Sequence, residues 1–214
     1  MQVVISGANR GIGAALAERY AAAGDVVVGT SRDGSTGQIL DVTNPDDHKA
    51  LAASLDKAPV DLLICNAGVY LDKGHTLETG YPPGMWAQTF AANVTGVFLA
   101  VQALLPNLRA ADRAKIAIIS SQMASHERAP GGSYIYRSSK AAALNLGRNL
   151  ASDLREDGIA VGIYHPGWVR TDMGGSSAEI LVGDAADGLV ERFDRLSIAT
   201  TGCFETWDGR THPY

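Results

Sequence analysis

Short apolar runs alternate with longer stretches of helical periodicity along the 214-residue chain, and this alternation restricts the fold more than any other feature. The expected strands are Gln2–Ser6, Asp25–Thr30, Gln38–Leu40, Leu62–Cys65, Lys115–Ser120, Ala160–Tyr164 and Thr201–Glu205. The expected helices are Ile12–Ala23, Asp46–Lys57, Trp86–Leu108, Tyr134–Glu156 and Asp184–Arg195. Strand–helix–strand repeats form right-handed crossovers, and near-continuous apolar strands indicate helices on both faces. The sequence therefore predicts an α/β fold with one doubly wound parallel sheet of about seven strands.

One connection is too short for a helical crossover. Only residues 31–37 separate the second expected strand from the third, whereas a crossover with a helix needs about a dozen residues. The helix between these two strands is therefore predicted to be missing. No repeat, low-complexity tract or linker divides the chain, so we expect a single domain over residues 1–214.

Charge and the start of the chain restrict the expected partners. The formal net charge is −5 and no run of basic residues indicates a nucleic-acid partner. Met1 leads directly into an apolar strand without a signal peptide, and we expect no stretch long enough to span a membrane. Cys65 and Cys203 are expected to be reduced thiols. These features predict a cytoplasmic protein with no membrane partner and no metal site.

A glycine-rich turn follows the first expected strand. Residues Ser6–Gly13 read Ser-Gly-Ala-Asn-Arg-Gly-Ile-Gly and open the first helix. Glycines let the backbone approach a pyrophosphate, and a helix N-terminus offers free N–H groups and a partial positive charge. A structural turn is the alternative reading of this segment taken alone. Its place between strand and helix favours a phosphate cradle.

Tyr136 and Lys140 form a second motif, Tyr-x-x-x-Lys, which follows a strand that ends at Ser120 and Ser121. Residues four apart lie on one face of a helix, so both side chains reach one site. A free phenol has a pKa of about 10, and a nearby ammonium is expected to lower it toward the range of a useful acid–base catalyst. The alternative is an exposed helix lysine beside a tyrosine at the edge of the core.

These motifs, in this order, resemble the short-chain dehydrogenase/reductase family, which has a Rossmann-type sheet. The segment Trp168–Gly175 and the tail Phe204–Gly209 resemble its C-factor-like and carbonyl-reductase-like branch. Ser6 stands where the family usually has threonine, and its hydroxyl is expected to keep the capping role. Ala124 stands where glycine is often found. The segment from Ser121 to Tyr136 is longer than usual, and the role of its His126 is open.

The resemblance implies the catalytic residues Asn93, Ser121, Tyr136 and Lys140. Tyr136 is implied to be the general acid/base, and Ser121 to hold the substrate oxygen, with Ser120 as the alternative serine. Lys140 is implied to bond the nicotinamide ribose, and Asn93 to hold a water that links Lys140 to bulk solvent.

The second strand carries no acid near its end, where enzymes specific for NAD usually hold the ribose. Arg32 lies just beyond, and Arg10 lies inside the glycine-rich turn. Two guanidinium groups that converge on the ribose favour a 2′-phosphate and hence NADP(H), with NAD(H) as the alternative cofactor. Solvated arginines, or a pair between Arg32 and Asp33, are the alternative interpretation. The implied cofactor site comprises Gly7, Asn9, Arg10, Gly11, Ile12, Gly13, Arg32, Asp41, Val42, Asn66, Ala67, Gly68, Tyr136, Lys140, Pro166, Gly167, Val169 and Thr171.

The sequence thus predicts an NADP(H)-dependent oxidoreductase that moves a hydride between nicotinamide and a small carbonyl or alcohol, with tyrosine as the acid/base. The alternatives are a catalytically silent dinucleotide-binding sensor or regulatory protein, and a structural or interaction protein. The long apolar helices favour a homodimer or homotetramer. The expected partner is a small-molecule substrate, and neither a nucleic acid nor a membrane is expected to bind.

Overall fold

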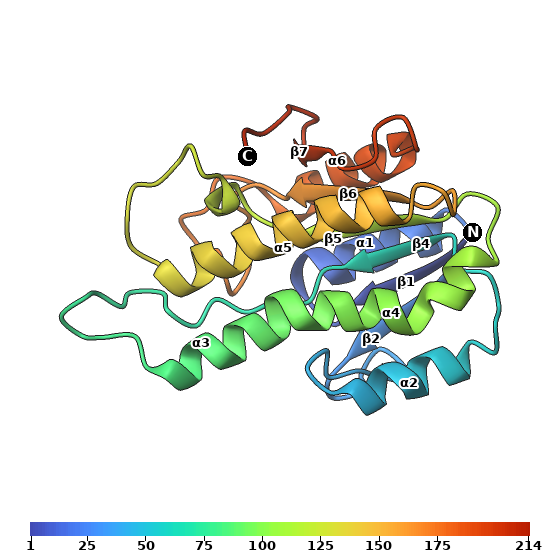
Figure 1. Ribbon diagram of the computed structural model, residues 1–214, viewed down its shortest axis with the longest axis horizontal. Coiled ribbons are helices and arrows are strands. Elements are labelled where there is room, and N and C mark those ends of the chain that lie inside the picture. Colours follow the sequence, from blue (N-terminus) through green and yellow to red (C-terminus); the bar gives the residue numbers. More distant parts are fainter.

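Seven parallel strands form one sheet at the centre of the computed structural model, which describes residues 1–214 (Figure 1). The strands are β1 (Gln2–Ser6), β2 (Val26–Ser31), β3 (Gln38–Ile39), β4 (Leu62–Cys65), β5 (Lys115–Ile119), β6 (Ala160–His165) and β7 (Phe204–Thr206). Their order is β3-β2-β1-β4-β5-β6-β7, and every neighbouring pair is parallel. The predicted doubly wound sheet is confirmed. Strand order reverses between β1 and β4, which opens a crevice at the carboxyl edge of the sheet.

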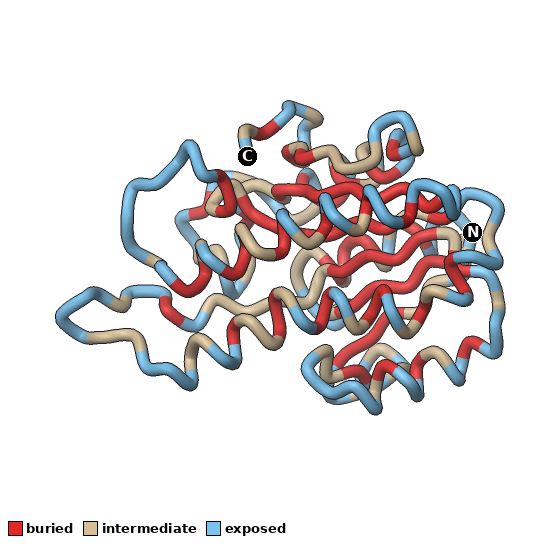
Figure 2. The backbone as a smooth tube through the Cα atoms, in the orientation of Figure 1, coloured by how far each residue is buried: buried red, intermediate tan, exposed pale blue.

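Helices cover both faces of this sheet because each strand sends alternate side chains to opposite sides. The helices are α1 (Gly11–Ala22), α2 (Pro45–Ser54), α3 (Pro83–Phe90), α4 (Gly96–Arg109), α5 (Tyr134–Asp153) and α6 (Val182–Arg195). Leu63 packs in a core cluster with α2, α4 and α5, whereas Leu62 and Ile64 pack in a second cluster with α1 and α6. Figure 2 shows the buried strands between the two helical layers.

The connection between β2 and β3 contains only turns, which confirms the missing helix. Several predicted boundaries were wrong. Helix α2 ends before the predicted Lys57, because Asp56 and Lys57 have the positive φ angles 41° and 61°. Strand β7 begins at Phe204, because Thr201 and Gly202 lie in a turn. Helix α5 ends at Asp153, ahead of the predicted end at Glu156.

The helix predicted over Trp86–Leu108 runs from Pro83 to Arg109, and a π-helical turn η1 (Ala91–Thr95) joins α3 to α4. By length and composition alone this helix could cross a membrane, so the prediction that no stretch reaches that length was wrong. Its inner face packs against the sheet through Val97, Ala100, Val101, Leu104 and Leu108. These contacts make it a helix of the core.

Helix α5 receives its N-terminal cap from a distant residue. Ser133, which precedes the helix, has a φ of 47° and its side chain does not cap. The carboxylate of Asp72, between β4 and α3, is fully buried and accepts N–H groups from Ile135 (2.9 Å) and Tyr136 (3.2 Å). Asp72 therefore holds the start of α5 against the segment that follows β4.

Replacing Asp72 by alanine is expected to destabilise the fold, because two buried N–H groups lose a charged acceptor. We expect Asp72→Ala to lower the free energy of unfolding by about 2 kcal/mol, measured by urea denaturation. Asp72→Asn keeps one acceptor oxygen and is expected to lose less. Asp112→Ala, at an exposed turn, is the matched control. Equal unfolding midpoints for Asp72→Ala and Asp112→Ala would contradict the proposed cap.

Candidate active site

Four of the segments implied by the family resemblance follow the carboxyl ends of neighbouring strands. Residues Gly7–Gly13 follow β1 and Asn66–Gly68 follow β4. Ser121 follows β5, and Pro166–Thr171 follow β6. Because parallel strands end at the same edge, these segments border one crevice.

Close packing explains the glycines of the first turn. Gly7 and Gly11 have φ angles of 70° and 55°, which side-chain-bearing residues rarely adopt. A Cβ on Gly13 would lie 2.1 Å from the carbonyl oxygen of Gly7. The Ser6 hydroxyl does not cap α1 as expected, because its Oγ accepts the N–H groups of Asn66 (3.0 Å) and Ala67 (3.1 Å). Ser6 thus connects the turn after β1 to the turn after β4.

The N-terminus of α1 fits a phosphate group. No side chain caps this helix of 12 residues, and its first turn contains no acidic residue. Its first N–H groups and its dipole therefore favour an anion at the crevice. Asn9 and Arg10 are exposed beside it, and Ile12 is half-buried. This arrangement fits the pyrophosphate of a dinucleotide.

Of the two arginines expected at the ribose, Arg10 is held in an ion pair and Arg32 is exposed. The Nη1 atom of Arg10 forms a 2.6 Å ion pair with Asp172, which follows β6. Arg32 is exposed and does not pair with Asp33, since Asp33 accepts hydrogen bonds from Ser35. The expectation of convergence missed Asp172 because this contact joins residues that are far apart in the sequence.

Asp41 and Val42 lie where the chain leaves β3. The Asp41 carboxylate accepts from both the backbone N–H (2.9 Å) and the hydroxyl (2.8 Å) of Thr43, and these bonds lower the pKa of Asp41. The Val42 carbonyl oxygen lies 2.9 Å from Nε2 of His48. Gly96 packs tightly on Val42, where a Cβ would lie 2.8 Å from the Val42 oxygen.

Tyr136 and Lys140 lie on the buried face of α5. The Nζ atom of Lys140 lies 5.7 Å from the centre of the Tyr136 ring and donates to the carbonyl oxygen of Ile119 (2.9 Å). Ser121 lies close enough to the Tyr136 phenol to lower its pKa. Ser120 instead donates to the carbonyl oxygen of Lys140 (3.1 Å), which leaves Ser121 as the serine beside the tyrosine.

Asn93 lies inside the π-helical turn η1 and is buried, so it does not face solvent. Its Oδ1 accepts the Val69 N–H (2.8 Å), and its Nδ2 donates to the Val69 carbonyl (2.9 Å) and to the Ser139 hydroxyl (3.0 Å). A Cβ on Gly68 would lie 3.0 Å from Asn93 Oδ1 and 3.4 Å from Lys140 Nζ. Gly68 therefore lies against both polar groups.

Burial dominates the acid–base properties of the site. It raises the pKa of Tyr136 to about 12, against the lowering effect of Ser121. It lowers the pKa of Lys140 to about 8. The expected lowering of the tyrosine pKa by Lys140 is not seen, because the phenol is almost fully desolvated.

Tyr70 causes part of this burial, and sequence reasoning missed it. Its ring stacks on the Tyr136 ring with centres 4.2 Å apart, and its hydroxyl hydrogen-bonds Ser133. Asp72, two residues later, was also missed. The signal available in the sequence was their position directly after the Asn-Ala-Gly turn, since residues there leave a strand toward the crevice.

The segment after β6 closes the crevice from the other side. Gly167 has a φ of 88°, and Val169 is buried and pairs with Ile180. Thr171 lies beside the glycine-rich turn, since a Cβ on Gly11 would be 3.3 Å from its Cγ2 atom. His126 is exposed, and its side chain forms no hydrogen bond or ion pair.

Comparisons with known proteins agree with this arrangement. The family model for short chain dehydrogenase matches residues 1–180. C-signal of Myxococcus xanthus is 34% identical over 178 residues, which cover 78% of this chain and 99% of that protein. A 1-hydroxy-2-glutathionyl-2-methyl-3-butene dehydrogenase of Rhodococcus sp. (strain AD45) is 32% identical, with 97% and 96% covered.

Solved structures extend the match to the whole chain. NADPH-bound carbonyl reductase from chicken fatty liver is 29% identical with a TM-score of 0.91, and 100% of this chain and 98% of that chain are covered. Carbonyl reductase Sniffer of D. melanogaster is 26% identical with a TM-score of 0.91, and 100% and 99% are covered. This chain belongs to the short-chain dehydrogenase family.

Proposed function

We propose that this protein is an NADP(H)-dependent reductase of small carbonyl compounds. The observation that carries the proposal is the grouping of four residues at the carboxyl edge of the sheet: Gly68 lies against Asn93 and Lys140, Lys140 lies near the Tyr136 ring, and Ser121 lies near its phenol. A sensor that only binds a dinucleotide has no need of a buried phenol beside a serine hydroxyl. Similarity to an NADPH-bound carbonyl reductase adds support.

The chain's own groups account for the proton transfer. With a pKa of about 12, Tyr136 stays protonated near neutral pH and donates its proton to the substrate oxygen. The Ser121 hydroxyl, near the phenol, holds the same oxygen and stabilises the charge that develops on it. With a pKa of about 8, Lys140 remains largely cationic at pH 7. The nicotinamide, when bound, supplies or accepts the hydride.

The nucleotide preference rests on the end of β2. Thr30 and Ser31 are followed by the exposed Arg32, with no carboxylate at the position that favours NAD. Arg10 is within reach of the same groove but is paired with Asp172. We therefore assign Arg32, and not Arg10, as the main partner of the 2′-phosphate of NADP(H). NAD(H) remains the alternative cofactor.

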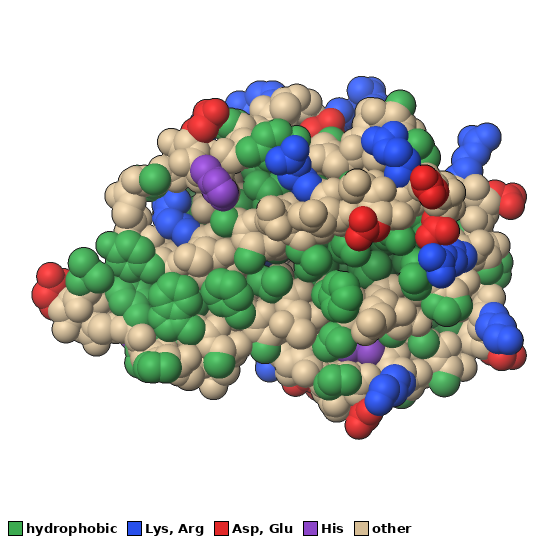
Figure 3. Space-filling view, in the orientation of Figure 1, with side chains coloured by type: hydrophobic (Ala, Val, Ile, Leu, Met, Phe, Trp, Pro, Cys, Tyr) green, Lys and Arg blue, Asp and Glu red, His purple; other side chains and the backbone are tan.

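The proposal extends to the whole protein as one cytoplasmic domain that assembles as a homodimer or homotetramer. Hydrophobic side chains are spread over the face that carries α3 and α4 (Figure 3). Phe98 on α4 is 42% exposed. Exposed apolar area of this kind favours contact with a second copy.

Loss of the phenol is expected to abolish turnover without preventing cofactor binding. Tyr136→Phe should lower kcat by at least about 100-fold, and Ser121→Ala by about 100-fold, in NADPH oxidation with aldehydes, ketones and diketones. Tyr20→Phe, in the core between α1 and α6, is the control, because the Tyr20 hydroxyl has no hydrogen-bond partner. Full activity of Tyr136→Phe would refute the assignment. NADPH binding by the wild type with no turnover would favour the sensor.

The nucleotide assignment predicts opposite effects of two variants. Arg32→Gln should raise KM for NADPH about tenfold and leave KM for NADH unchanged, because only NADPH carries the 2′-phosphate. Asp172→Asn releases Arg10 and should lower KM for NADPH up to about fivefold, the strength of an exposed ion pair. Asp187→Asn breaks an exposed pair with Arg19 and is the control. Equal changes for both cofactors would contradict the assignment.

The oligomer proposal predicts a mass at least twice the 22.4 kDa of one chain in light scattering after gel filtration. Phe98→Asp should shift the protein toward the monomer, because a charge at an apolar interface is costly. Phe98→Leu is the conservative control. A wild-type protein that elutes at the monomer mass would contradict the proposed homodimer or homotetramer.

A further inference from the structure

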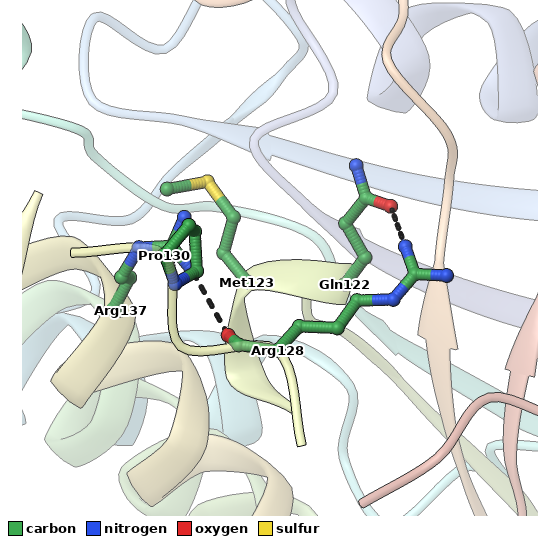
Figure 4. A pocket seen from close by; sticks show the side chains of 5 residues that line it. All are labelled: Gln122, Met123, Arg128, Pro130 and Arg137. Carbon is green, nitrogen blue, oxygen red and sulfur yellow. Dashed lines mark hydrogen bonds between the residues drawn. The ribbon is translucent and has the colours of Figure 1, made fainter. Parts of the chain in front are cut away.

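Two arginines line a small cavity whose walls include the residues that directly follow Ser121 and Tyr136 in the chain. The cavity has a volume of about 170 Å³ and lies between the short helix η2 (Gln122–Ala124), the loop that follows it and the first turn of α5. It is lined by Gln122, Met123, Arg128, Pro130 and Arg137 (Figure 4). No carboxylate lines it.

Both guanidinium groups lack a negative partner. The Nη1 atom of Arg128 donates to Oε1 of Gln122 (3.1 Å), and Nη1 of Arg137 makes a long contact with the carbonyl oxygen of Arg128 (3.4 Å). The Nε atom of Arg137 is buried and has no hydrogen-bond partner. Six other arginines pair with carboxylates: Arg10, Arg19, Arg109, Arg192, Arg195 and Arg210.

A partly desolvated cation without a counter-charge is unfavourable, and a planar guanidinium matches the geometry of carboxylate and phosphate oxygens. An anion in this cavity would form charge-assisted hydrogen bonds with the guanidinium groups of Arg128 and Arg137, which both line it. The cavity therefore has the charge and the donors of an anion site.

Residues of this anion site are neighbours in the chain of the proposed catalytic residues. Gln122 directly follows Ser121, and Arg137 directly follows Tyr136, so their Cα atoms are about 3.8 Å from those of the two residues that hold the carbonyl oxygen. The Met123 N–H donates to Ser121 Oγ (3.1 Å). The cavity wall and the proposed catalytic residues thus belong to the same two segments, the start of η2 and the first turn of α5.

Arg128 also borders a second, larger cavity of about 380 Å³. Gln122 lines both cavities, and Gly167 and Trp168 of the segment after β6 line the larger one. In the larger cavity Arg210 is already paired with Asp208 (2.8 Å). Glu179 also lines the larger cavity, but Arg128 hydrogen-bonds Gln122 and forms no ion pair.

We propose that the preferred substrates of this enzyme carry a carboxylate or phosphate group, which Arg128 and Arg137 bind while the carbonyl lies at Ser121 and Tyr136. This proposal rests on the reductase function proposed above and adds the substrate class. It explains the long segment between Ser121 and Tyr136, which is the part of the chain that carries Arg128 to the site.

Matched pairs of carbonyl compounds test the proposal with NADPH as cofactor. The pairs are 4-oxopentanoate and 6-oxoheptanoate against their methyl esters, and dihydroxyacetone phosphate against dihydroxyacetone. The wild type should show a kcat/KM at least about tenfold higher for the charged member, or about 1.4 kcal/mol, mainly through KM. Comparison of the oxo acids with the phosphate shows whether the site prefers a carboxylate or a phosphate group.

Arg128→Gln and Arg137→Gln should remove most of this preference, and Arg128→Lys should retain part of it because the charge remains. Arg113→Gln removes an exposed arginine just before β5, at the opposite edge of the sheet, and should leave the preference unchanged. Far-UV circular dichroism and thermal melting show whether each variant is folded. If a glutamine variant is misfolded, Arg128→Lys is compared with the wild type instead. It is expected to show a smaller preference for the charged substrates than the wild type.

Equal kcat/KM values for charged and neutral members would overturn the anion site and leave the reductase function intact. If no compound is reduced, the reductase proposal fails, and thermal shift with NADPH present then tests the anion site alone. A higher Tm with the oxo acids or the phosphate, absent with their neutral partners and lost in Arg128→Gln, would support the site. No such shift would overturn it.

Discussion

The hydrogen bonds between the turns after β1 and β4 are the contact on which the rest of the site depends. Ser6 Oγ accepts two N–H groups from the second turn, and the Asn66 amide donates back to the carbonyl oxygens of Ser6 (3.1 Å) and Gly7 (3.0 Å). Strand order reverses at β1 and β4, and these hydrogen bonds continue the pairing of the two strands into the turns that follow them. With the turns after β1 and β4 held together, Gly68 lies against Asn93 and Lys140. The cofactor groove and the acid–base group are thereby positioned by the same few bonds.

The segment after β4 then transmits this geometry to α5. Asn93 holds its backbone at Val69, Tyr70 stacks on Tyr136, and Asp72 caps the first turn of the helix. These contacts also exclude water from the phenol, which raises its pKa to about 12. Positioning and desolvation of the tyrosine are therefore two consequences of one packing arrangement. In the direction of carbonyl reduction a protonated phenol is the form required.

The sequence was sufficient for features that local pattern determines. Alternating apolar runs predicted the sheet and the missing helix, and the motif spacing placed Tyr136 and Lys140 on one helix face. Contacts between distant residues were out of reach, as with Arg10 and Asp172 or Asp72 and Tyr136, since no local pattern encodes them. The direction of the tyrosine pKa shift failed for the same reason, because burial depends on what packs from elsewhere in the chain.

The distribution of charge at the carboxyl edge follows from these contacts. The protein has a net charge of −5, which weakly repels an anionic ligand at distance, but salt screens that repulsion beyond about 8 Å at physiological ionic strength. Within the crevice, Asp72 is occupied by backbone N–H groups and Asp172 by Arg10. The N-terminus of α1, Arg32, Arg128 and Arg137 carry positive charge there without a carboxylate partner, and Glu179 adds one negative charge to the larger cavity that Arg128 borders. Selectivity for anions consequently depends on short-range contacts with these groups and not on the overall field of the protein.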